Sequence, residues 1–576
     1  MKILGIFHSG FDPSAALLID DRVVAYVEEE RLIRDKHAKG RFPTRSIDYV
    51  LEAGGVEIAD IDYLAQAWDC QKYDNGVVAK HYEEINKKYP TNSEDIAYQN
   101  SHLNTFRSER QKGIILQNLR RQYGEIAFPD LKFVHHHFAH ACTAYFCSGM
   151  EESLVLTIDG SGEEITTAWW IGKDEKLTLL KEIKVPHSLG WLYSAFTEYL
   201  GFQAYDGEYK VMGLAAFGEH DKEIKSKIDK LIRYDGEGGF ESDPLILARG
   251  PRKFSSYYPD ALPKHLGRPP RAEKQVIDKW HKDCAFVVQQ TLEEIVQEMA
   301  RYWIEKTGVR NLCISGGVGL NVKMNGNIYA SGLVDDLFVY PLCSDAGQSI
   351  GAAMALRYEL RGLKNVKISH LLLGPEYTDE EIKRILSNCK IEFSEEESIE
   401  KKVAELISEG AIVGWFQGRM EGGPRALGAR SILADPRNVK SRDKVNEVIK
   451  YRELWRPFCP SMTAEGAEMY FDKYTDAPFM IMTFGANEKA EKEVPAIVHV
   501  DKTSRPHIVE RNGNERYYDL IQEFKNLTGI PVLLNTSFNV KGEPIVCTPQ
   551  DALRTFSATG LDVLAIGNCL VTKSNL

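Results

Sequence analysis

The stretch Leu154-Val155-Leu156-Thr157-Ile158-Asp159-Gly160-Ser161-Gly162 predicts a buried strand that ends in a loop of glycine and aspartate. Two more strands are expected after it, at 166–171 and 177–183, and the turn between them is predicted at Gly172-Lys173. The first thirty residues have the same order, with strands predicted at 2–7, 14–19 and 22–28 and a polar loop at 8–13. This repeat predicts a duplicated α/β domain in which each half presents one polar loop, whereas two unrelated meanders are the simpler explanation.

The rest of the chain continues the alternation of helices and strands. A long helix is predicted over Val276–Lys306, ending at Gly308, and a helix of small residues over Ile350–Leu360. Strands expected at 311–315 and 337–342 each lead into a glycine-containing turn. The pattern lapses between 362 and 375, so we place one domain at 1–362 and a second α/β domain at 375–576. Apolar strands of the second domain are predicted at 411–416, 530–535 and 563–566.

Composition excludes several classes of protein. The chain has 576 residues, 43% hydrophobic and 27% charged, which is too long for one core and too apolar for disorder. No apolar run approaches the roughly 20 residues that span a bilayer, and the first residues run into a strand without the features of a leader. Ten cysteines without a CxxC pair indicate reduced thiols and a cytoplasmic location. A net charge of -12 disfavours a broad nucleic-acid-binding surface.

Four glycine-rich loops follow predicted strands of the first domain, around Gly10, Gly160, Gly316 and Gly347. Glycine lets backbone amides approach anionic oxygens closely, so loops of this kind can bind phosphate. One such loop is usually only a tight turn, but four in one domain favour a nucleotide cleft. Neither the P-loop pattern nor the Rossmann fingerprint is present.

The histidine-rich stretch 135–140 is a candidate metal site. On a helix, His136 and His140 lie at i and i+4 and face the same way. The glutamate of a zinc-protease motif is absent. Asp159 and Asp345 each follow a predicted strand and could complete a site of two histidines and two carboxylates. Nitrogen and oxygen ligands without thiolate suit ferrous iron, manganese or zinc, and the simpler explanation is a structural histidine pair.

Arginine and lysine residues of the second domain alternate with aromatic, proline and leucine residues. The alternation favours a half-buried basic surface for a small phosphorylated ligand over a solvated face, since arginine makes bidentate bonds to phosphate. The strand expected at 530–535 leads into Asn535-Thr536-Ser537-Phe538-Asn539, whose polar groups could hold a neutral amide. The basic candidates are Arg425, Lys450, Arg456 and Arg505.

Long motifs along nearly the whole chain resemble one enzyme family, the O-carbamoyltransferases typified by nodulation protein U and cephalosporin carbamoyltransferase. In the first domain the matching motifs are EEER at 28–31 with Lys36-His37, HHFAHA at 136–141, DGSGE at 159–163, YKVMGLAAFG at 209–218, SGGVGLN at 315–321 and SDAGQSIGAA at 344–353. In the second domain they are MEGGPRALGARSILADPR at 420–437, WRPFCPSM at 455–462 and LNTSFNVKGEPIV at 534–546.

The resemblance implies an ASKHA-type domain, related to actin-like ATPases, joined to a smaller YrdC-like domain. It implies that the second domain uses carbamoyl phosphate and ATP, with Mg²⁺, to make carbamoyl-adenylate and pyrophosphate. A hydroxyl group of a small natural-product acceptor, as in antibiotic biosynthesis, then takes the carbamoyl group and AMP leaves.

The matching motifs also imply roles for individual residues. A ferrous-type ion would be held by His136, His140, Asp159 and Asp345. The adenylate would be contacted by Lys36, Asp159, Gly160, Gly190 and Asn321. Carbamoyl phosphate and nucleotide would be bound by Arg425, Lys450, Arg456, Arg505, Asn535, Ser537 and Asn539.

The first loop departs from the family, in which a histidine precedes the aspartate and serves the acceptor hydroxyl. Phe11 occupies that position here, so we expect His8 or Asp12, together with Lys36, to act in catalysis. The departure leaves open a nucleotide-binding regulatory protein without turnover. Threonylcarbamoyl transfer to tRNA and the activity of a sugar kinase or ATPase also stay open. The acceptor is not identified by the sequence, although the insert at 73–110 and the stretch 249–271 could shape its pocket or a homodimer contact.

Overall fold

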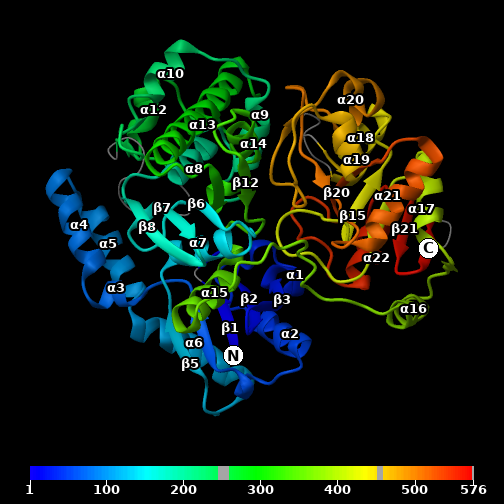
Figure 1. The fold of residues 1–576 in the computed structure, drawn as a ribbon, viewed down its shortest axis with the longest axis horizontal. Coiled ribbons are helices and arrows are strands. Elements are labelled where there is room, and N and C mark those ends of the chain that lie inside the picture. The colour runs from blue at the N-terminus through cyan, green and yellow to red at the C-terminus, as the bar shows by residue number, and fades with distance from the viewer. Residues whose placement is uncertain (9, 244–257, 451–457, 574–576) are drawn as a thin grey trace. The chain divides into compact units, whose positions relative to one another are not determined.

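The computed structural model describes residues 1–8, 10–243, 258–450 and 458–573 (Figure 1). The chain folds into two compact units, and neither is continuous in sequence. The first unit comprises Met1–Phe7, Ala16–Val23 and Gly54–Lys367. The second comprises His8–Ala15, Val24–Ala53 and Ile368–Leu576. The change at 367–368 falls within the boundary expected at 362–375, but segments 8–15 and 24–53 lie in the second unit rather than with the N-terminal domain.

Two five-stranded sheets have the same strand order, and this confirms the duplication predicted from the sequence. One sheet has the order β3-β2-β1-β4-β5 and the other the order β8-β7-β6-β11-β12. In each sheet the central strand pairs in parallel with the next strand, and that strand pairs in parallel with the edge strand. The first sheet consists of β1 (Lys2–Phe7), β2 (Ser14–Ile19), β3 (Arg22–Glu28), β4 (Tyr63–Gln66) and β5 (Asp130–Phe133). The second consists of β6 (Glu152–Ile158), β7 (Ile165–Lys173), β8 (Lys176–Lys184), β11 (Asn311–Ser315) and β12 (Asp336–Val339).

The helices that follow the edge strands occupy equivalent places in the two halves. Helix α7 (His136–Phe146) follows β5 and packs on β6 and β11, whereas α15 (Gln348–Arg361) follows β12 and packs on β1 and β4. The two helices also contact each other. Gly5 of β1 allows α15 to come close, because a Cβ atom there would lie 1.8 Å from the carbonyl oxygen of Ser349. Each helix of the crossed pair therefore covers the sheet of the other half.

Three predicted boundaries were wrong, each for a local reason. The β7–β8 turn lies at Asp174-Glu175, with φ values of 50° and 57°, and not at Gly172-Lys173. Gly172 stays in the strand, where its missing side chain makes room for the ring of Tyr145. Helix α13 (Lys279–Thr307) begins three residues after the predicted Val276, because Asp278 caps it. Strand β12 ends at Val339, ahead of a proline that lacks the amide hydrogen for pairing.

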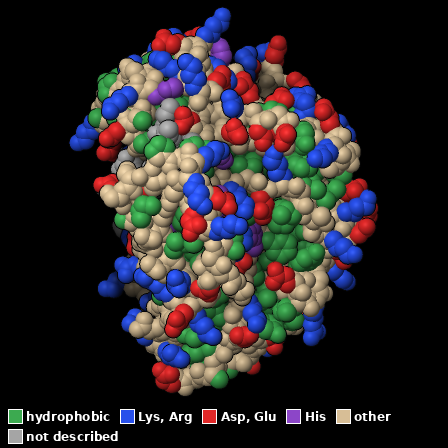
Figure 2. All heavy atoms as spheres, turned by 90° about the vertical axis from the view of Figure 1, so that its left-hand side faces the viewer, with side chains coloured by type: hydrophobic (Ala, Val, Ile, Leu, Met, Phe, Trp, Pro, Cys, Tyr) green, Lys and Arg blue, Asp and Glu red, His purple; other side chains and the backbone are tan. Residues whose placement is uncertain are grey.

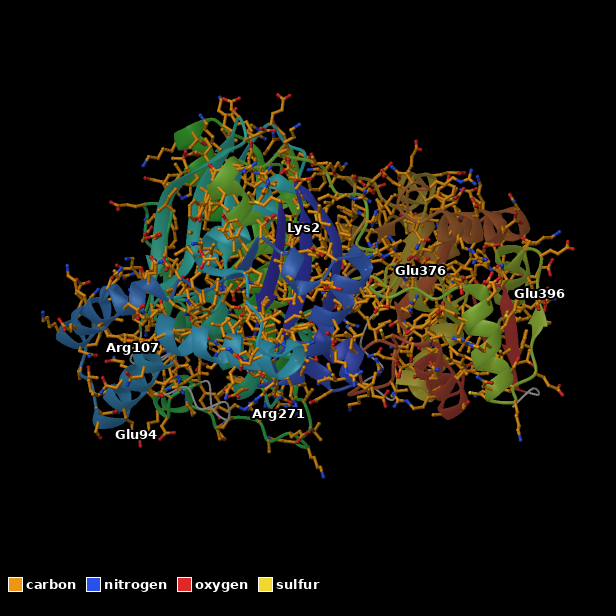
Figure 3. All side chains as sticks on the ribbon, turned by 90° about the horizontal axis from the view of Figure 1, so that it is seen from below. Lys2, Glu94, Arg107, Arg271, Glu376 and Glu396 are labelled. Carbon is orange, nitrogen blue, oxygen red and sulfur yellow. The ribbon has the colours of Figure 1, made fainter. Side chains whose placement is uncertain are left out.

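A helical insertion lies between β4 and β5 and covers the predicted insert at 73–110. It consists of α3 (Gln71–Asp74), α4 (Val77–Lys88), α5 (Ser93–Thr105) and α6 (Ser108–Tyr123). Glu94 and Arg107, at the starts of α5 and α6, are labelled in Figure 3. The insertion has its own small core, in which Phe106 stacks on the indole of Trp68 with 4.4 Å between ring centroids. Basic and acidic side chains are interspersed over the face drawn in Figure 2.

The first unit contains several shorter elements. These are η2 (Ile58–Asp60), α8 (Leu189–Tyr199), α9 (Glu208–Ala215), α10 (Lys222–Ile228), β9 (Ile232–Tyr234), β10 (Phe240–Ser242), α12 (Ala261–Leu266), η3 (Gly317–Leu320), α14 (Val322–Ala330) and η4 (Asp345–Gly347). All ten cysteines of the chain lie in the described residues and are free thiols. Across the described ranges, every helix is too short or too polar to traverse a bilayer.

The second unit is built on an eight-stranded sheet with the order β13-β22-β21-β14-β15-β20-β16-β19. Its strands are β13 (Ser394–Glu395), β14 (Val413–Phe416), β15 (Arg430–Ala434), β16 (Cys459–Met462), β19 (His507–Ile508), β20 (Val532–Ser537), β21 (Val563–Ile566) and β22 (Cys569–Thr572). Its other elements are α1 (Glu29–Ile33), η1 (Lys36–Ala38), α2 (Thr44–Gly54), α16 (Asp379–Asn388), α17 (Ile399–Ser408), α18 (Val439–Val445), η5 (Asn446–Lys450), α19 (Ala464–Tyr470), β17 (Phe484–Gly485), α20 (Glu488–Glu493), η6 (Pro495–Ile497), β18 (Thr503–Ser504), α21 (Glu515–Thr528) and α22 (Pro549–Ala558).

Buried polar contacts explain why 24–53 belongs to the second unit. Arg31 of α1 donates to the carbonyl oxygen of Gly423 at 2.8 Å, and the amide of Gly423 donates to Glu28 at 2.7 Å. Arg34 lies 3.3 Å from a carboxylate oxygen of Asp551 and donates to the carbonyl oxygen of Ile545. These contacts join the N-terminal segment to residues that follow it by about four hundred or more positions.

Candidate functional site

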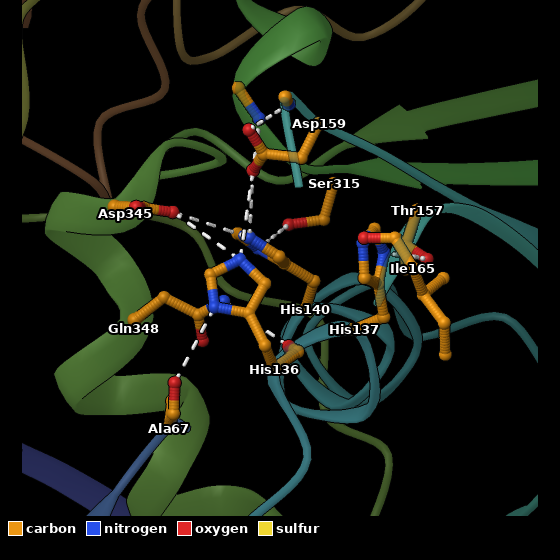
Figure 4. Close-up of polar contacts among 12 residues, drawn as sticks. Ala67, His136, His137, His140, Thr157, Asp159, Ile165, Ser315, Asp345 and Gln348 are labelled. Atoms are coloured by element: carbon orange, nitrogen blue, oxygen red, sulfur yellow. Dashed lines mark hydrogen bonds and ion pairs between the residues drawn. The ribbon is translucent and has the colours of Figure 1, made fainter. Parts of the chain in front are cut away.

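Two histidines and two aspartates of the first unit converge on one point (Figure 4). Nε2 of His140 lies 3.2 Å from Oδ2 of Asp159, and Nε2 of His136 lies 3.5 Å from Oδ1 of Asp345. One nitrogen or oxygen atom from each of the four side chains lies within 4.8 Å of the other three. The structure therefore brings together all four residues predicted to form a metal site.

The fold supplies these side chains from three places. His136 and His140 are one turn apart at the start of α7, as expected, and both are buried. Asp159 follows β6, the central strand of its sheet, and Asp345 begins the single turn η4 after β12. Since β6, β11 and β12 are parallel neighbours, their C-terminal ends share one edge of the sheet.

A second set of contacts orients the four side chains. Nδ1 of His140 lies 3.2 Å from the hydroxyl of Ser315, the last residue of β11. Nδ1 of His136 lies 3.4 Å from the carbonyl oxygen of Ala67. Each ring thus uses Nδ1 for orientation and turns Nε2 toward the aspartates, the arrangement common for metal-binding imidazoles. Asp159 is held by the amides of Gly160 at 2.6 Å and Gly317 at 3.0 Å.

The cluster is electrostatically prepared for positive charge. Burial lowers the pKa of His136, but the carboxylates of Asp345 and Asp159 outweigh this effect and raise it to about 9. Burial would likewise raise the pKa of Asp159, but the close contact and the positive charge of the two histidines hold it well below its usual range. A carboxylate that stays ionised beside buried imidazoles favours the binding of a cation at this place.

The donor atoms of the cluster fit a divalent metal ion. Nε2 of His136, Nε2 of His140 and Oδ1 of Asp345 are all buried and have no hydrogen-bond partner among the described residues. Buried polar atoms without partners are costly, and an ion bound by all four residues would satisfy these three. Two nitrogen and two oxygen ligands suit iron, manganese or zinc.

The neighbouring histidines do not join the cluster. His137 is fixed between the hydroxyl of Thr157 at 2.9 Å and the carbonyl oxygen of Ile165 at 3.1 Å, and burial lowers its pKa well below the usual value. His135 caps α7 by accepting the amide hydrogen of Phe138. These two histidines stabilise the fold around the site.

The loop that contains Asp159 packs against the start of α8. A Cβ atom on Gly190 would lie 2.7 Å from the carbonyl oxygen of Asp159 and 2.7 Å from the amide nitrogen of Gly160, so only glycine fits there. Ser188 caps α8 and donates to the carbonyl oxygen of Gly160 at 2.8 Å. The structure therefore brings Gly190 and Gly160, both predicted to contact the adenylate, next to Asp159 of the candidate metal site.

Asn321 is the fourth residue of the first unit that was predicted to contact the adenylate. Its side chain contacts residues of α13 and α14. It caps α14 by accepting from the amide of Met324, and its side-chain amide pairs with Gln289 of α13 through two hydrogen bonds of 2.9 Å. The fifth member of the set, Lys36, lies in the second unit, on the turn η1.

Three predicted ligand-binding residues meet in the second unit. The ammonium group of Lys450 donates to the hydroxyl and carbonyl oxygens of Ser537 and to the side-chain and carbonyl oxygens of Asn539, at 2.5–3.2 Å. Ser537 also donates to Asn539 at 2.7 Å. The buried ammonium group of Lys450 is thus fixed at the end of β20 by oxygen atoms of Ser537 and Asn539.

The remaining predicted residues of this set lie along the same strands. Asn535 of β20 donates to the hydroxyl of Ser461 at 2.8 Å and pairs across the sheet with Cys459 of β16. The guanidinium of Arg505 donates to the sulfur of Cys459 at 2.7 and 2.9 Å. Arg425 is half-buried in the loop 421–430. Arg456 lies outside the described residues.

Two side chains of the loop 421–430, for which the sequence predicted no role, stabilise its backbone by hydrogen bonds. Glu421 accepts the amide hydrogens of Leu427, Ala429 and Arg430 at 2.8–3.3 Å. Arg430 is completely buried, donates to four carbonyl oxygens and covers the ring of Phe416, so it is a structural residue. The only signal for Glu421 was its place in a glycine-rich motif.

The predicted catalytic loop belongs to the second unit. Asp12 lies 2.8 Å from Nδ1 of His37, a residue next to Lys36 for which the sequence predicted no role. The ring of His8 packs on Phe42 at 5.5 Å, and burial lowers its pKa to about 4. Ser315, which orients His140, was missed as well, although it begins the motif at 315–321.

Comparison with known proteins identifies relatives along the whole chain. The family described as carbamoyltransferase N-terminus matches residues 2–354, and the family described as carbamoyltransferase C-terminus matches residues 404–573. An uncharacterized protein of Synechocystis is 36% identical, over 99% of this chain and 97% of its own length. Nodulation protein NolNO of Sinorhizobium fredii is 36% identical, over 98% of this chain and 79% of its own. Component A of the (R)-2-hydroxyglutaryl-CoA dehydratase of Acidaminococcus fermentans aligns with 62% of this chain and 98% of its own, at 13% identity and a TM-score of 0.34.

Proposed function

The chain belongs to the carbamoyltransferase family, and from this premise we propose that it transfers the carbamoyl group of carbamoyl phosphate to a hydroxyl group of a small acceptor at the expense of ATP. The observation that carries the proposal is the cluster of buried His136 and His140 with half-buried Asp159 and Asp345 in a chain of this family. A cation site made of two imidazoles and two carboxylates suits a reaction that develops negative charge on a carbonyl oxygen.

The first half of the proposed reaction makes a mixed anhydride. Water releases inorganic phosphate from carbamoyl phosphate, and an oxygen of the resulting carbamate forms a bond to the α-phosphorus of ATP while the bond to pyrophosphate breaks. Lys450 supplies positive charge to the phosphate oxygens, and Ser537 and Asn539 hold its ammonium group in place. Arg425 and Arg505 supply further positive charge in the same unit. Mg²⁺ accompanies ATP, and we retain a YrdC-like domain as the expectation for this unit.

The second half transfers the carbamoyl group. The acceptor oxygen bonds to the carbamoyl carbon, the bond from that carbon to the phosphate oxygen of AMP breaks, and the acceptor proton must go to a base. When bound, an ion at the four-residue cluster supplies Lewis acidity to the carbonyl group. Ser315 and the amides of Gly160 and Gly317 keep the imidazole and carboxylate ligands in position. An ASKHA-type nucleotide site in the first unit, with Gly190 beside Asp159, is part of this proposal.

The test is release of pyrophosphate by the purified chain with ATP and carbamoyl phosphate, without an acceptor. We expect release that depends on carbamoyl phosphate, and a loss of about 100-fold in Lys450→Met, which removes the ammonium group and keeps the length of the side chain. Lys444→Met is the matched control, because Lys444 pairs with Asp562 at an exposed position of the same unit. Absence of pyrophosphate release in the unchanged chain would contradict the proposal and favour a nucleotide-binding protein without turnover.

A further inference from the structure

The two segments that carry the aspartates of the candidate metal site also bind the backbone of His136. Glu163 lies four residues after Asp159, and Gln348 lies three residues after Asp345. Oε1 of Glu163 accepts the backbone amide hydrogen of His136 at 3.1 Å. The side-chain amide of Gln348 donates to the backbone carbonyl oxygen of His136 at 3.2 Å (Figure 4). Each segment that supplies an aspartate therefore also holds the residue that supplies an imidazole.

Both hydrogen bonds are shielded from water, since Glu163 and Gln348 are each no more than 2% exposed. His136 is the first residue of α7. The first amides of a helix have no acceptor within the helix, and leaving one of them buried without a partner is costly. Glu163 supplies the acceptor that α7 itself cannot supply.

Glu163 faces N–H groups of the protein with both of its carboxylate oxygens. Its Oε1 accepts a second backbone amide hydrogen, from Asp69, at 2.6 Å. Its Oε2 lies 3.5 Å from Nε2 of His135. Nδ1 of His135 accepts the amide hydrogen of Phe138, so Nε2 of the neutral ring carries the proton. This carboxylate is therefore placed to orient the protein around the site rather than to bind the ion.

The loop from Asp159 to Glu163 also packs directly on the imidazole of His136. A Cβ atom on Gly162 would lie 2.9 Å from Cβ and 3.0 Å from Cδ2 of His136, so a larger residue would push the ring away. The indole of Trp68 meets the same imidazole edge to face, with 5.3 Å between ring centroids. The backbone and the ring of His136 are thus both fixed by neighbouring segments.

The two histidines of the site differ in how much support they need. His140 lies one turn inside α7, and the hydroxyl of Ser315 orients its ring at 3.2 Å. His136 lies at the very end of the helix, and the contact of its Nδ1 with the carbonyl oxygen of Ala67 is longer, at 3.4 Å. Because helix ends fray, His136 depends more on contacts made to its backbone.

We propose that Glu163 and Gln348 are positioning residues, which hold the imidazole of His136 at the distance from Asp159 and Asp345 that one bound ion requires. The inference rests on the ion site of the function proposed above. A shift of either aspartate segment moves His136 with it, so the spacing of the donor atoms is kept. The four ligands then form a site that is assembled before the ion binds.

The experiment measures the binding of Co²⁺ to the full chain, because the visible absorption of bound Co²⁺ changes with the geometry of its ligands. We expect Glu163→Ala to lower the affinity about 10-fold to 100-fold and Gln348→Met about 10-fold, each with a changed absorption spectrum. Glu163→Gln keeps a carbonyl oxygen for the amides of Asp69 and His136. We therefore expect it to restore the affinity to within about 5-fold of that of the unchanged chain.

The controls are two other side chains of the first unit that bond to backbone groups. Glu208 accepts the amide hydrogens of Tyr205 at 2.9 Å and Gly207 at 3.2 Å, and Gln111 donates to the carbonyl oxygen of Thr105 at 2.7 Å. We expect Glu208→Ala and Gln111→Met to lower the resistance to urea and to leave the affinity and the spectrum of bound Co²⁺ unchanged.

Three results overturn the inference. The first is an unchanged affinity and spectrum in both Glu163→Ala and Gln348→Met. The second is a Glu163→Gln variant that binds Co²⁺ as weakly as Glu163→Ala, because the charge and not the hydrogen bond would then be responsible. The third is an equal loss of affinity in the control variants, which would be an effect of general stability.

Circular dichroism checks the fold of each variant. If Glu163→Ala does not fold, Gln348→Met decides the outcome, because methionine keeps the length of the side chain and removes only its amide group. Absence of Co²⁺ binding by the unchanged chain contradicts the ion site of the proposed function itself.

Discussion

The imidazole of His140 turns Nδ1 toward the hydroxyl of Ser315, at 3.2 Å, and this contact directs Nε2 toward the carboxylate of Asp159. Ser315 is itself buried at the end of β11 and also contacts Thr143 at 3.4 Å. The hydroxyl group of Ser315 on β11 thus orients the imidazole ring of His140 on α7.

Removal of this hydroxyl should weaken metal binding without abolishing it. We expect Ser315→Ala to lower the affinity for Mn²⁺ by about 10-fold to 100-fold, because the ring of His140 loses the partner that orients it. Isothermal titration with Mn²⁺ measures the effect. Ser331→Ala, which removes a hydroxyl from the end of α14, should leave the affinity unchanged. Equal affinities for Ser315→Ala and the unchanged chain would contradict the orienting role.

Replacement of a ligand should have a larger effect than replacement of its orienting partner. We expect His140→Ala to remove stoichiometric Mn²⁺ binding, since the remaining donors are one imidazole and two carboxylates. Elemental analysis after gel filtration gives the stoichiometry, and far-ultraviolet circular dichroism checks the fold. His220→Ala, at an exposed position, is the control. One bound ion per chain in His140→Ala would show that the ion lies elsewhere.

The close contact at Gly190 makes it sensitive to a single methyl group. The Cβ atom in Gly190→Ala would lie 2.7 Å from backbone atoms of Asp159 and Gly160, so α8 or the loop must move. We expect a loss of about 1–3 kcal/mol in the free energy of unfolding, together with weaker Mn²⁺ binding. Gly113→Ala is the matched control, because among the described residues no atom outside the backbone of α6 lies within 4 Å of the Cβ atom that it would add. It should increase the stability by about 0.5–1 kcal/mol, and urea denaturation distinguishes the two outcomes.

Arg31 should be important for the stability of the second unit. Its side chain is 4% exposed, pairs with Glu30 at 3.0 Å and donates to the carbonyl oxygen of Gly423. Arg31→Met removes the guanidinium charge and leaves the carboxylates of Glu28 and Glu30 buried without it. We therefore expect the free energy of unfolding to fall by about 3–5 kcal/mol. Arg233→Met, at an exposed pair with Glu241, should change the stability by less than about 1 kcal/mol. Similar denaturation midpoints for the two variants would argue against the buried network.

The helical insertion should be sensitive to acid through His102. Burial lowers the pKa of His102 to about 4, and Nδ1 lies 2.8 Å from the hydroxyl of Tyr82. Between about pH 6.5 and pH 4 the unfolded chain binds this proton and the folded chain does not, so stability is complete above pH 6.5 and falls as pH is lowered. In this window we expect His102 to lower the free energy of unfolding by about 1 kcal/mol for each pH unit of acidification. His102→Gln should remove this pH dependence. Hydrogen exchange of α4 and α5 at pH 5 and pH 7 measures it, with the exposed His220→Gln as control.

Local pattern predicted the strands well, and it also predicted the four residues that meet in the candidate metal site. The strands at 2–7, 14–19 and 22–28 were found at those positions because buried apolar runs between turns leave little choice of conformation. The i and i+4 spacing of His136 and His140 fixed their shared helix face, and the ends of parallel strands brought Asp159 and Asp345 to the same edge. These relations depend on short stretches and on general sheet geometry.

Contacts between distant stretches could not be predicted in the same way. Asp12 and His37 meet because three residues adopt left-handed backbone and two loops share hydrogen bonds, and neither feature has a periodic signal. The segment 24–53 joins the second unit through buried ion pairs with residues far along the chain. Arg430, in the same motif as Arg425, is completely buried and donates to backbone carbonyl oxygens, and its place in a basic motif gives no sign of this structural role.

The divided second unit has a consequence for biosynthesis. The carbonyl group that Arg31 binds belongs to a residue 392 positions later in the chain. At a synthesis rate of about 5–20 residues per second, Gly423 is synthesised about 20–80 s after Arg31. During that interval Glu28, Glu29, Glu30 and Arg31 are hydrated charges rather than buried ones, which keeps the waiting segment soluble. The second unit is therefore completed only after residues 368–576 have been synthesised, whereas the segments of the first unit are all synthesised by residue 367.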